Sequence, residues 1–382
     1  MSRYKELGID VKKAGIQKFR TSISNLFPEA FCVIQKDPIY KDMGIVLHTD
    51  SAGSKPIQAY LHYKETGNPN WFQGIAQDAF AMNHNDILCV GAKPVTFVDY
   101  IAFNTLLINR IELLDSLAKG FEKCISIMKK QESDLLFAGG ETADLPDLLR
   151  TLDVCVTMLG RARLNDFITG KKIESGDIII GLRSGGRLNY EEGLNSGIMS
   201  NGLTLARSCL MKSQYVEKYP ELAHPSKNRY TGKYTFDENL DNLKMTVGEA
   251  LLSPTRLFGP IVCKVLEEFR LGIHGMAHNT GGGQTKCLRM GKNVKYVKNN
   301  LPEPDPIFRL IKKESGVKWK EMYQDFNMGI GFEFVVNPDF ADNIIEICEK
   351  FGIGVYRIGY CTKSSNGNSL VIKSEFGDFQ YT

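Results

Sequence analysis

Short apolar runs alternate with segments of helical period along this chain, and that alternation limits its fold more than any other feature. Apolar residues at helical spacing predict one helix from Phe72 to residues 85–86, a second from Ile111 to Met128 and a third over 340–351. Strands are expected over residues 44–47, 95–100, 135–138, 154–159, 177–181, 332–336 and 355–360. The pattern favours an α/β or α+β protein over a helical bundle or a β-sandwich.

The length of 382 residues is too great for one ordinary hydrophobic core and predicts two domains. A polar connection over residues 161–176 separates two sets of elements, so we expect an N-terminal domain over 1–168 and a C-terminal domain over 169–382. Residues 213–245 are rich in Lys, Tyr, Asn and Pro, which predicts an inserted surface excursion that contributes little to the core. This organisation favours a ligand site in a cleft between domains or subunits.

Charge and cysteine usage narrow the class of protein. Subtracting 44 acidic from 47 basic residues leaves a net charge of +3 without a long basic run, so no nucleic-acid or membrane partner is expected. The nine cysteines occur singly, mostly in apolar runs, which is typical of buried reduced thiols. The chain has no run of about 18 apolar residues, and its first residues lack the apolar stretch of a signal peptide. A cytoplasmic protein is expected.

The chemistry is expected in four clusters of acids, small polar residues and glycines near the ends of predicted elements. No P-loop, G-x-G-x-x-G, H-E-x-x-H, C-x-x-C or G-x-S-x-G motif is present, so several common enzyme classes lose support. The clusters span residues 48–55, 85–86, 139–142 and 279–283. Their predicted nucleotide-binding residues are Asp50, Gly53, Ser54, Lys55, Asn85, Asp86, Gly139, Gly140, Glu141, Thr142, Gly281, Gly282 and Gly283.

Carboxylates beside glycines indicate a site for magnesium and phosphate. Mg²⁺ prefers hard oxygen ligands and usually takes one or two carboxylates with phosphates and water, so Asp50, Asp86 and Glu141 are its predicted ligands. Glycines let backbone N–H groups approach phosphate oxygens, and Lys55 would place a point charge on the same phosphates. A nucleotide with Mg²⁺ is therefore the expected ligand of this site.

The same residues also have structural interpretations. Any one of these clusters is what a turn or a helix cap contains, and the glycines at 281–283 alone would suit a flexible loop. His278 alone would be a hydrogen-bonded structural histidine. Asp78, Asn85 and Asp86 lie seven and eight residues apart on the predicted Phe72 helix, so they share nearly one face, which could line a polar cleft. The four clusters together favour the functional interpretation.

Seven segments, in order and spacing, resemble the aminoimidazole ribonucleotide synthetase family, also called phosphoribosylformylglycinamidine cyclo-ligase. The resemblance spans most of the chain and rests on HTDSAGSK, AQDAFAMNHNDILCVGAKPVTFVDYIA, FAGGETADLP, SGIMSNGLTLAR, LLSPTRLF, GMAHNTGGG and EMYQDFNMGIG. The corresponding family segments include D-G-V-G-T-K, G-G-E-T-A-E-M-P, S-G-L-H-S-N-G and F-N-M-G-I-G.

This resemblance implies a two-domain α+β protomer, with an N-terminal mixed-sheet domain for dimerisation and ATP binding and a C-terminal α/β sandwich domain. It implies a homodimeric, ATP-dependent ligase of de novo purine biosynthesis with a small ribonucleotide substrate. In the family reaction, ATP phosphorylates the formamide oxygen of formylglycinamidine ribonucleotide. The amidine nitrogen then attacks the activated carbon, and phosphate leaves as the ring closes. Lys55, Asp99 and His278 are the predicted catalytic residues, the last two for substrate contact or proton transfer.

Departures from the family pattern keep other functions open. Residues 25–44 hold one glycine where the family has a glycine-rich stretch associated with closing over nucleotide, and Met199 replaces a histidine. Gly283 is followed by Gln-Thr-Lys, another departure. The alternatives are a sister ATP-dependent kinase or synthetase of the same superfamily and a catalytically silent ligand-binding paralogue. A selenophosphate enzyme is disfavoured because Cys32 lies in an apolar run and is expected to be buried.

Overall fold

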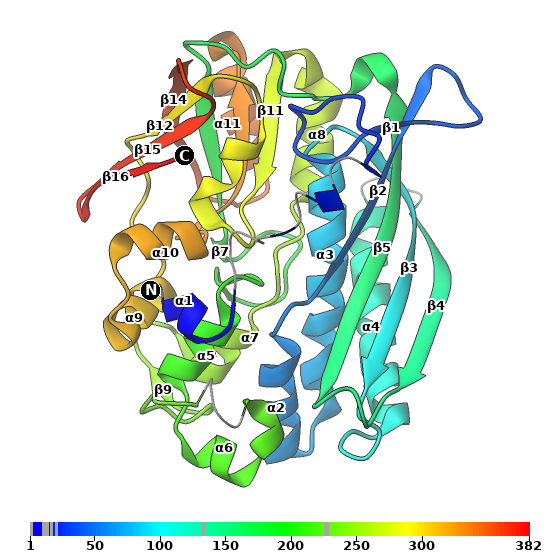
Figure 1. Cartoon of the computed structure of the whole chain (residues 1–382), viewed down its shortest axis with the longest axis vertical. Coiled ribbons are helices and arrows are strands. Elements are labelled where there is room, and N and C mark those ends of the chain that lie inside the picture. The colour runs from blue at the N-terminus through cyan, green and yellow to red at the C-terminus, as the bar shows by residue number, and fades with distance from the viewer. Residues whose placement is uncertain (1–2, 10–14, 16–17, 20–21, 131–134, 225–228) are drawn as a thin grey trace.

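The N-terminal half of the chain forms a five-stranded mixed sheet in the order β1-β2-β5-β3-β4 (Figure 1). The computed structural model describes residues 3–9, 15, 18–19, 22–130, 135–224 and 229–382. Neighbouring strands of this sheet are antiparallel, except β3 and β4, which are parallel. The strands are β1 (Gln35–Lys36), β2 (Met43–Ser51), β3 (Lys93–Phe103), β4 (Leu136–Asp144) and β5 (Leu152–Arg163).

Two helices, α3 (Gln73–Leu88) and α4 (Arg110–Lys129), cover one face of this sheet. Phe97 of β3 packs at right angles against Phe80 of α3 and also contacts Phe121 of α4. The helices approach closely because a Cβ on Gly120 would lie 2.4 Å from the carbonyl oxygen of Gln73. Helix α2 (Pro56–Thr66) follows β2. In the described part of the chain the opposite face of the sheet stays open, with Leu47, Val98 and Leu136 exposed.

Helix α3 lies between the N-terminal sheet and the C-terminal half of the chain (Figure 1). Almost every residue from Ile75 to Leu88 is buried, including several polar ones. Because buried polar groups require hydrogen-bond partners, the polar side chains of α3 find them in both halves of the protein. Asp78 and Asn85 both bond to segments of the C-terminal half. This helix therefore joins the two domains.

The C-terminal half is built on a seven-stranded mixed sheet in the order β11-β13-β6-β14-β12-β15-β16. Its strands are β6 (Ile178–Arg183), β11 (Ile273–His278), β12 (Val294–Lys298), β13 (Ile330–Val336), β14 (Val355–Lys363), β15 (Ser369–Ser374) and β16 (Gly377–Tyr381). Two short two-stranded sheets pair β7 (Gly185–Gly186) with β8 (Asn195–Ser196) and β9 (Asn239–Leu240) with β10 (Met245–Thr246). The helices are α5 (Leu203–Leu210), α6 (Gln214–Lys218), α7 (Val247–Leu252), α8 (Gly259–Phe269), α9 (Pro306–Ser315), α10 (Trp319–Asp325) and α11 (Ala341–Glu349). The predicted α+β architecture is confirmed.

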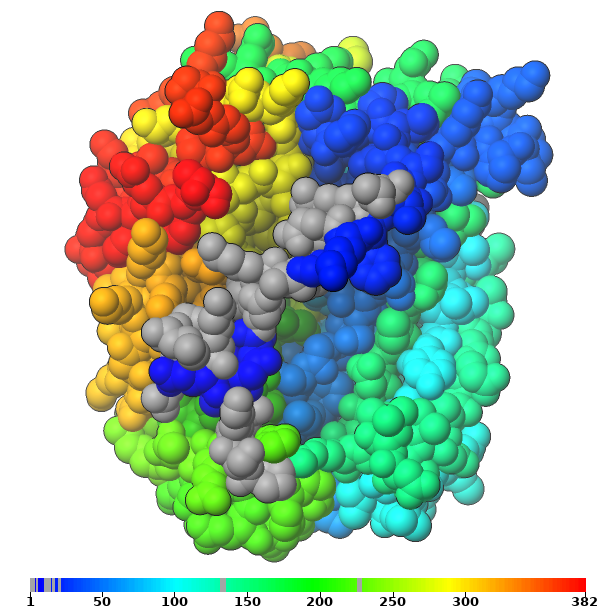
Figure 2. All heavy atoms as spheres, in the orientation of Figure 1, coloured from blue at the N-terminus to red at the C-terminus, as the bar shows by residue number. Residues whose placement is uncertain are grey.

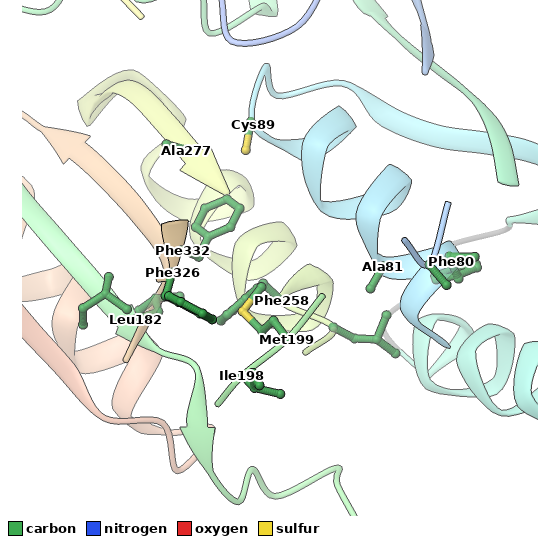
Figure 3. Packing of buried hydrophobic residues seen from close by; sticks show 14 of the residues in the cluster. Phe80, Ala81, Cys89, Leu182, Ile198, Met199, Phe258, Ala277, Phe326 and Phe332 are labelled. Atoms are coloured by element: carbon green, nitrogen blue, oxygen red, sulfur yellow. The ribbon is translucent and has the colours of Figure 1, made fainter. Parts of the chain in front are cut away.

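Met199 belongs to the core of the C-terminal domain. Figure 3 shows it beside Phe258, and both side chains lie under 3 Å from the Cβ position that Gly331 leaves empty. Met199 is fully buried and has a positive φ of 56°. The departure from the family's histidine therefore adds an apolar core contact.

Residues 213–245 contribute more to the core than their composition predicts. Tyr215, Leu222, Tyr230, Tyr234 and Leu243 are all at most 7% exposed and belong to the main hydrophobic cluster. The expectation of a limited core contribution is thus wrong. Tyrosine combines a large apolar ring with a polar tip, so a Tyr-rich polar segment can still bury substantial surface.

The start of the chain contacts both domains (Figure 2). Helix α1 (Arg3–Glu6) lies beside the C-terminal domain, where Tyr4 is buried. Residues 25–44 fold back beside β2, with Phe31 and Ile34 buried. No helix of the described residues has the length and hydropathy needed to cross a membrane.

Candidate functional site

A cleft of about 550 Å³ lies between the two domains. Its N-terminal wall comes from the end of β2, the turn that follows β2 and helix α3. Its C-terminal wall comes from residues 200–204 at the start of α5, the turn after β11 and the segment Gly283–Arg289. The lining residues are Tyr4, Ile9, His48, Thr49, Asp50, Ser51, Gly53, Ser54, Met82, Asp86, Ser200, Asn201, Gly202, Leu203, Thr204, Thr280, Gly281, Gly282, Lys286, Arg289 and Asp325. Of the predicted site residues, Asp50, Gly53, Ser54, Asp86, Gly281 and Gly282 line it.

Asp86 is the most deeply placed carboxylate of the cleft. Its Oδ1 accepts a hydrogen bond from Nδ1 of His278 at 2.8 Å, and its Oδ2 lies 3.4 Å from Nε2 of His48. Burial alone would raise its pKa, but the hydrogen bond from His278 and the nearby charge of Lys286 outweigh burial and hold that pKa far below its usual range. Asp86 is therefore an anion at every physiological pH.

His278 does not line the cleft. Its side chain is fully buried, Nδ1 donates to Asp86, and Nε2 accepts a bond from the amide of Asn85. Burial lowers its pKa, so the ring is neutral and both nitrogens are engaged. His278 thus orients Asp86, and the expectation of direct proton transfer finds no support in this geometry.

Asp50 lies at the rim of the same wall. Its side-chain Oδ1 accepts a hydrogen bond from the backbone N–H of Ser51, and its main-chain carbonyl accepts one from Asn83 of α3. Asp50 is partly exposed, so its carboxylate can reach a ligand in the cleft. Gly53 has a positive φ of 66° and no atom within 4 Å of its Cβ position, which leaves backbone open to the cleft.

Two basic side chains of the opposite wall were missed by the sequence prediction. Lys286 is only 7% exposed and lies with Arg289 on the segment that follows the glycine turn. Burial lowers the pKa of Lys286, while the charge of Asp86 raises it. The sequence signal was present, since Lys286 stands in the departure from the family pattern directly after Gly283. The cleft therefore sets two acids of one domain against two bases of the other.

The glycine turn is divided between the cleft and the core. Gly281 and Gly282 line the cleft, and Gly282 has a φ of 105° that favours glycine. Gly283 points into the interior, where a Cβ would lie 2.2 Å from the carbonyl oxygen of Phe326. Only the first two glycines can therefore offer backbone groups to a phosphate.

Lys55 does not line the cleft. Its side chain is fully buried, and Nζ lies 2.7 Å from Oδ1 of Asp78 and 2.7 Å from the carbonyl oxygen of Ser253. Asp78 is also fully buried and accepts bonds from Ser200 and Thr255. Lys55 is therefore not placed to put its charge on phosphates in the cleft, as the sequence predicted. Asp78, which the sequence placed on a face that could line the cleft, does not line it either. The pair instead joins the domains.

Asn85 is buried as well. Its amide donates to the carbonyl of Arg256 and to His278, and its carbonyl oxygen accepts from the backbone of Phe258. All its hydrogen-bonding groups point into the domain junction and away from the cleft. On the predicted polar face of α3, only Asp86 reaches the cleft.

The cluster over 139–142 lies apart from the cleft within one chain. The strand registers pair Asp50 of β2 with Val156 of β5, and Val156 with Asp99 of β3. Asp99 in turn pairs with Gly140 of β4. Asp50 and Asp99 are therefore two strand spacings apart, about 10 Å. A Cβ on Gly140 would clash with the carboxylate of Asp99. Burial raises the pKa of Asp99 to about 6.

Glu141 lies on the open face of the sheet, away from Asp86. It pairs in register with Tyr100, which is 42% exposed, and is itself exposed. Three strand spacings, about 14 Å, separate β4 from β2, and the helices cover the other face. A single chain therefore does not bring Glu141, Gly139 or Thr142 to Asp50.

Asp325, at the end of α10, is a further acid of the cleft. Burial, with a smaller effect of Glu321, raises its pKa to about 7. A carboxyl of the unfolded chain has a pKa of about 3.9. Between these values the folded protein holds a proton that the unfolded chain has lost, so the free energy of unfolding falls as pH rises through this window.

The Asp325→Asn variant should therefore be more stable than the wild type at pH 8, by about 2 kcal/mol. The gain should shrink towards zero as the pH falls to about 4, where both forms of residue 325 are neutral. Denaturant unfolding of both proteins across this range measures the gap. If the variant and the wild type differed in free energy of unfolding by the same amount at about pH 4 and at pH 8, the raised pKa of Asp325 would be contradicted.

The fold and the cleft together define a two-domain α+β protein whose interdomain cleft combines carboxylates, a glycine turn and basic side chains. Family models of the AIR synthase related protein match this chain, the N-terminal domain over residues 31–162 and the C-terminal domain over 174–372. The chain belongs to this family. The predicted domain limit at 168/169 falls between the two matches and stays a prediction.

Two curated relatives that share one name match most of this chain. The protein of Methanocaldococcus jannaschii named phosphoribosylformylglycinamidine cyclo-ligase is 33% identical over 383 residues, which cover 98% of this chain and 97% of the relative. The protein of the same name from Methanothermobacter thermautotrophicus is 36% identical over 306 residues, covering 80% and 77%. The resemblance found in the sequence is confirmed.

Solved structures share the fold at low identity. T. maritima PurL complexed with FGAR matches with a TM-score of 0.57 and 14% identity, over 95% of this chain and 49% of that one. AaThiL complexed with AMPPCP and TMP matches with a TM-score of 0.56 and 13% identity, over 96% of both chains. These likenesses establish the fold alone.

Proposed function

We propose that this chain is a phosphoribosylformylglycinamidine cyclo-ligase, an ATP-dependent ligase of purine biosynthesis. The observation that carries the proposal is the interdomain cleft, in which Asp50 and Asp86 on one wall face Lys286, Arg289 and the glycine turn on the other. Such a cleft suits two phosphorylated ligands: a nucleoside triphosphate with its metal ion, and a ribonucleotide substrate. The relatives named above, which match nearly the whole chain, support the same activity.

The reaction needs activation because an amide oxygen is a poor leaving group. ATP would phosphorylate the formamide oxygen of formylglycinamidine ribonucleotide, giving ADP. The amidine nitrogen then attacks the activated carbon, the C–O bond to phosphate breaks, and loss of a proton leaves aminoimidazole ribonucleotide with phosphate. Lys286 and Arg289 would neutralise phosphate charge, and the exposed turn at Gly281 and Gly282 would bind phosphate through N–H groups.

Asp50 and Asp86 fit Mg²⁺ by donor type, since both present carboxylate oxygens to the cleft. Asp86 is held as an anion by His278, which makes it a ready ligand. When bound, Mg²⁺ would screen the triphosphate charge. Glu141, the third predicted ligand, fits this set only if a second subunit supplies it.

The open face of the N-terminal sheet supports a homodimer. It carries the exposed apolar side chains Leu47, Val98, Tyr100 and Leu136, each between 39% and 63% exposed. Packing two such faces together would bury these side chains and place Glu141 of one subunit against the sheet of its partner. The homodimer and a magnesium site shared between its two subunits are therefore a single proposal. None of the nine cysteines, all within the described residues, is in a disulfide, which supports the cytoplasm as the compartment.

The alternatives are a sister kinase or synthetase and a silent paralogue. The whole-length match to relatives of one name favours neither of them. Cys32 is 8% exposed, and burial together with the charge of Asp86 raises its pKa well above the usual range. It is therefore a protonated thiol, unlike the reactive cysteine that a selenophosphate enzyme would need.

An assay of the purified protein tests the proposal directly. With formylglycinamidine ribonucleotide, ATP and Mg²⁺, we expect release of ADP and phosphate that depends on the ribonucleotide. The gene should also restore growth of a purine auxotroph that lacks the enzyme. Absence of ribonucleotide-dependent ADP would reject the cyclo-ligase. If ATP then still raises the melting temperature, a sister or silent function takes its place.

A further inference from the structure

Three potential metal ligands converge at the deep end of the cleft. Cys32 comes from the loop before β1, His48 from β2 and Asp86 from the end of α3. One ligand atom of each (Sγ, Nε2 and a carboxylate oxygen) lies within 4.8 Å of the other two. Cys32 and Asp86 are buried, while His48 is partly exposed and lines the cleft, so water can reach the group from one side.

The hydrogen bonds around Asn83 fix the tautomer of His48. The amide nitrogen of Asn83 donates to the carbonyl oxygens of Asp50 and Ala79, at 3.1 and 2.9 Å. Its side-chain oxygen therefore faces Nδ1 of His48, at 2.8 Å, and must accept a hydrogen bond from it. In the neutral ring, Nε2 then carries a lone pair and no hydrogen.

That lone pair points at an anion. Nε2 of His48 lies 3.4 Å from Oδ2 of Asp86, while the other carboxylate oxygen is already bonded by His278. Two acceptors at this distance repel each other unless a cation lies between them. The cation is either a proton, which makes His48 an imidazolium, or a metal ion.

The sulfur of Cys32 determines which kind of metal ion the group would favour. Cys32 Sγ lies 3.2 Å from the main-chain oxygen of Asp86 and within 4.8 Å of a carboxylate oxygen of the same residue. A thiolate is a soft ligand that selects Zn²⁺ and similar ions over Mg²⁺. A tetrahedral Zn²⁺ bound at about 2.0–2.3 Å needs ligand atoms roughly 3–4 Å apart, which the 3.4 Å separation already satisfies. The sulfur, which lies within 4.8 Å of both other ligand atoms, needs only a small shift to reach this spacing.

We propose that Cys32, His48 and Asp86 form a binding site for a soft divalent transition metal, Zn²⁺ or a similar ion. The thiol loses its proton as the metal–sulfur bond forms, and cleft water supplies the fourth ligand. Asn83 is a positioning residue, since it holds the other ring nitrogen of His48 as a ligating histidine requires. This site goes beyond the proposed ligase reaction, in which Asp86 binds Mg²⁺ together with Asp50 and neither Cys32 nor His48 takes part.

Cobalt provides a direct test, since Co²⁺ occupies zinc sites and reports its ligands by absorption. Metal-free wild-type protein titrated with CoCl₂, without nucleotide or substrate, should develop a thiolate-to-cobalt charge-transfer band together with visible bands of a four-coordinate ion, at one equivalent. Cys32→Ser should abolish the charge-transfer band, and His48→Gln should weaken Co²⁺ binding by about 10- to 100-fold or more. The control Cys263→Ser, a substitution on α8 outside the cleft, should leave the spectrum unchanged.

Stability provides a second readout that separates lost binding from misfolding. ZnCl₂ should raise the melting temperature of wild type and Cys263→Ser but not of Cys32→Ser, whose metal-free melting temperature should stay close to wild type. No charge-transfer band in wild type, or the same band in Cys32→Ser, would overturn the site and leave the proton as the cation. Because neither measurement uses ATP or ribonucleotide, failure here is independent of failure of the ligase assay.

Discussion

Asp50→Asn and Glu141→Gln proteins should each react about 10²- to 10³-fold more slowly than wild type, yet an equal mixture should recover about a quarter of wild-type activity. Each substitution removes one negative charge from the proposed magnesium site. If the site combines Asp50 of one subunit with Glu141 of its partner, each mixed dimer holds one site with both carboxylates intact. Ribonucleotide-dependent ADP release, measured before and after subunit exchange, gives the result.

The geometry explains why the mixture is informative. In one chain, Glu141 is on the open face of the sheet and three strands from Asp50, so neither can complete the other's site. The control is Asp147→Asn, an exposed carboxylate shortly after β4, which should keep wild-type activity. If Glu141→Gln alone is fully active, Glu141 is no ligand. If the mixture stays inactive, the two carboxylates do not act across subunits.

Local pattern was enough to predict most elements of the fold. The apolar spacing from Ile111 to Met128 predicted a helix that the structure places at Arg110–Lys129, with Leu113, Leu117 and Phe121 buried. The side chain of Asn109 caps it by accepting two backbone N–H groups. Such a helix is fixed by residues close in sequence, so its periodicity carries the information.

The order of strands in the sheet is a long-range property, and this limited the prediction of the site. The cluster over 139–142 has the composition of a phosphate or metal site, but β3 and β5 lie between it and β2. No feature of the local sequence around Glu141 states which strands separate it from Asp50. The prediction therefore grouped three acids of which one chain brings only two together.

The direction of a side chain at an element boundary was equally hard to predict. Lys55 follows a turn beside the cleft, yet its charge is drawn inward by Asp78 of α3 and the carbonyl of Ser253, both distant in sequence. Lys286, interpreted as a departure from the family pattern, instead reaches the cleft. The sequence thus indicated a basic group at the site but assigned it to the wrong lysine for this geometry.

The buried pair of Lys55 and Asp78 should dominate the coupling of the two domains. Asp78→Ala should lower the free energy of unfolding by about 3–5 kcal/mol, because Lys55 then stays buried without its counter-charge. The carboxylate also accepts bonds from Ser200 and Thr255 of the C-terminal domain, so its loss weakens the domain junction itself. Equilibrium unfolding in denaturant measures the change.

The matched control is the pair of Lys119 and Asp115 on α4, which has a similar separation of 2.6 Å but is more than half exposed. Since exposed helical pairs contribute only about 0.3–0.5 kcal/mol, Asp115→Ala should barely shift the unfolding midpoint. A double variant, Lys55→Met with Asp78→Leu, should recover part of the lost stability, because it removes both buried charges and keeps apolar volume. If Asp78→Ala costs no more than Asp115→Ala, the two domains are held together chiefly by apolar contacts such as those around Phe258, and the ion pair adds little.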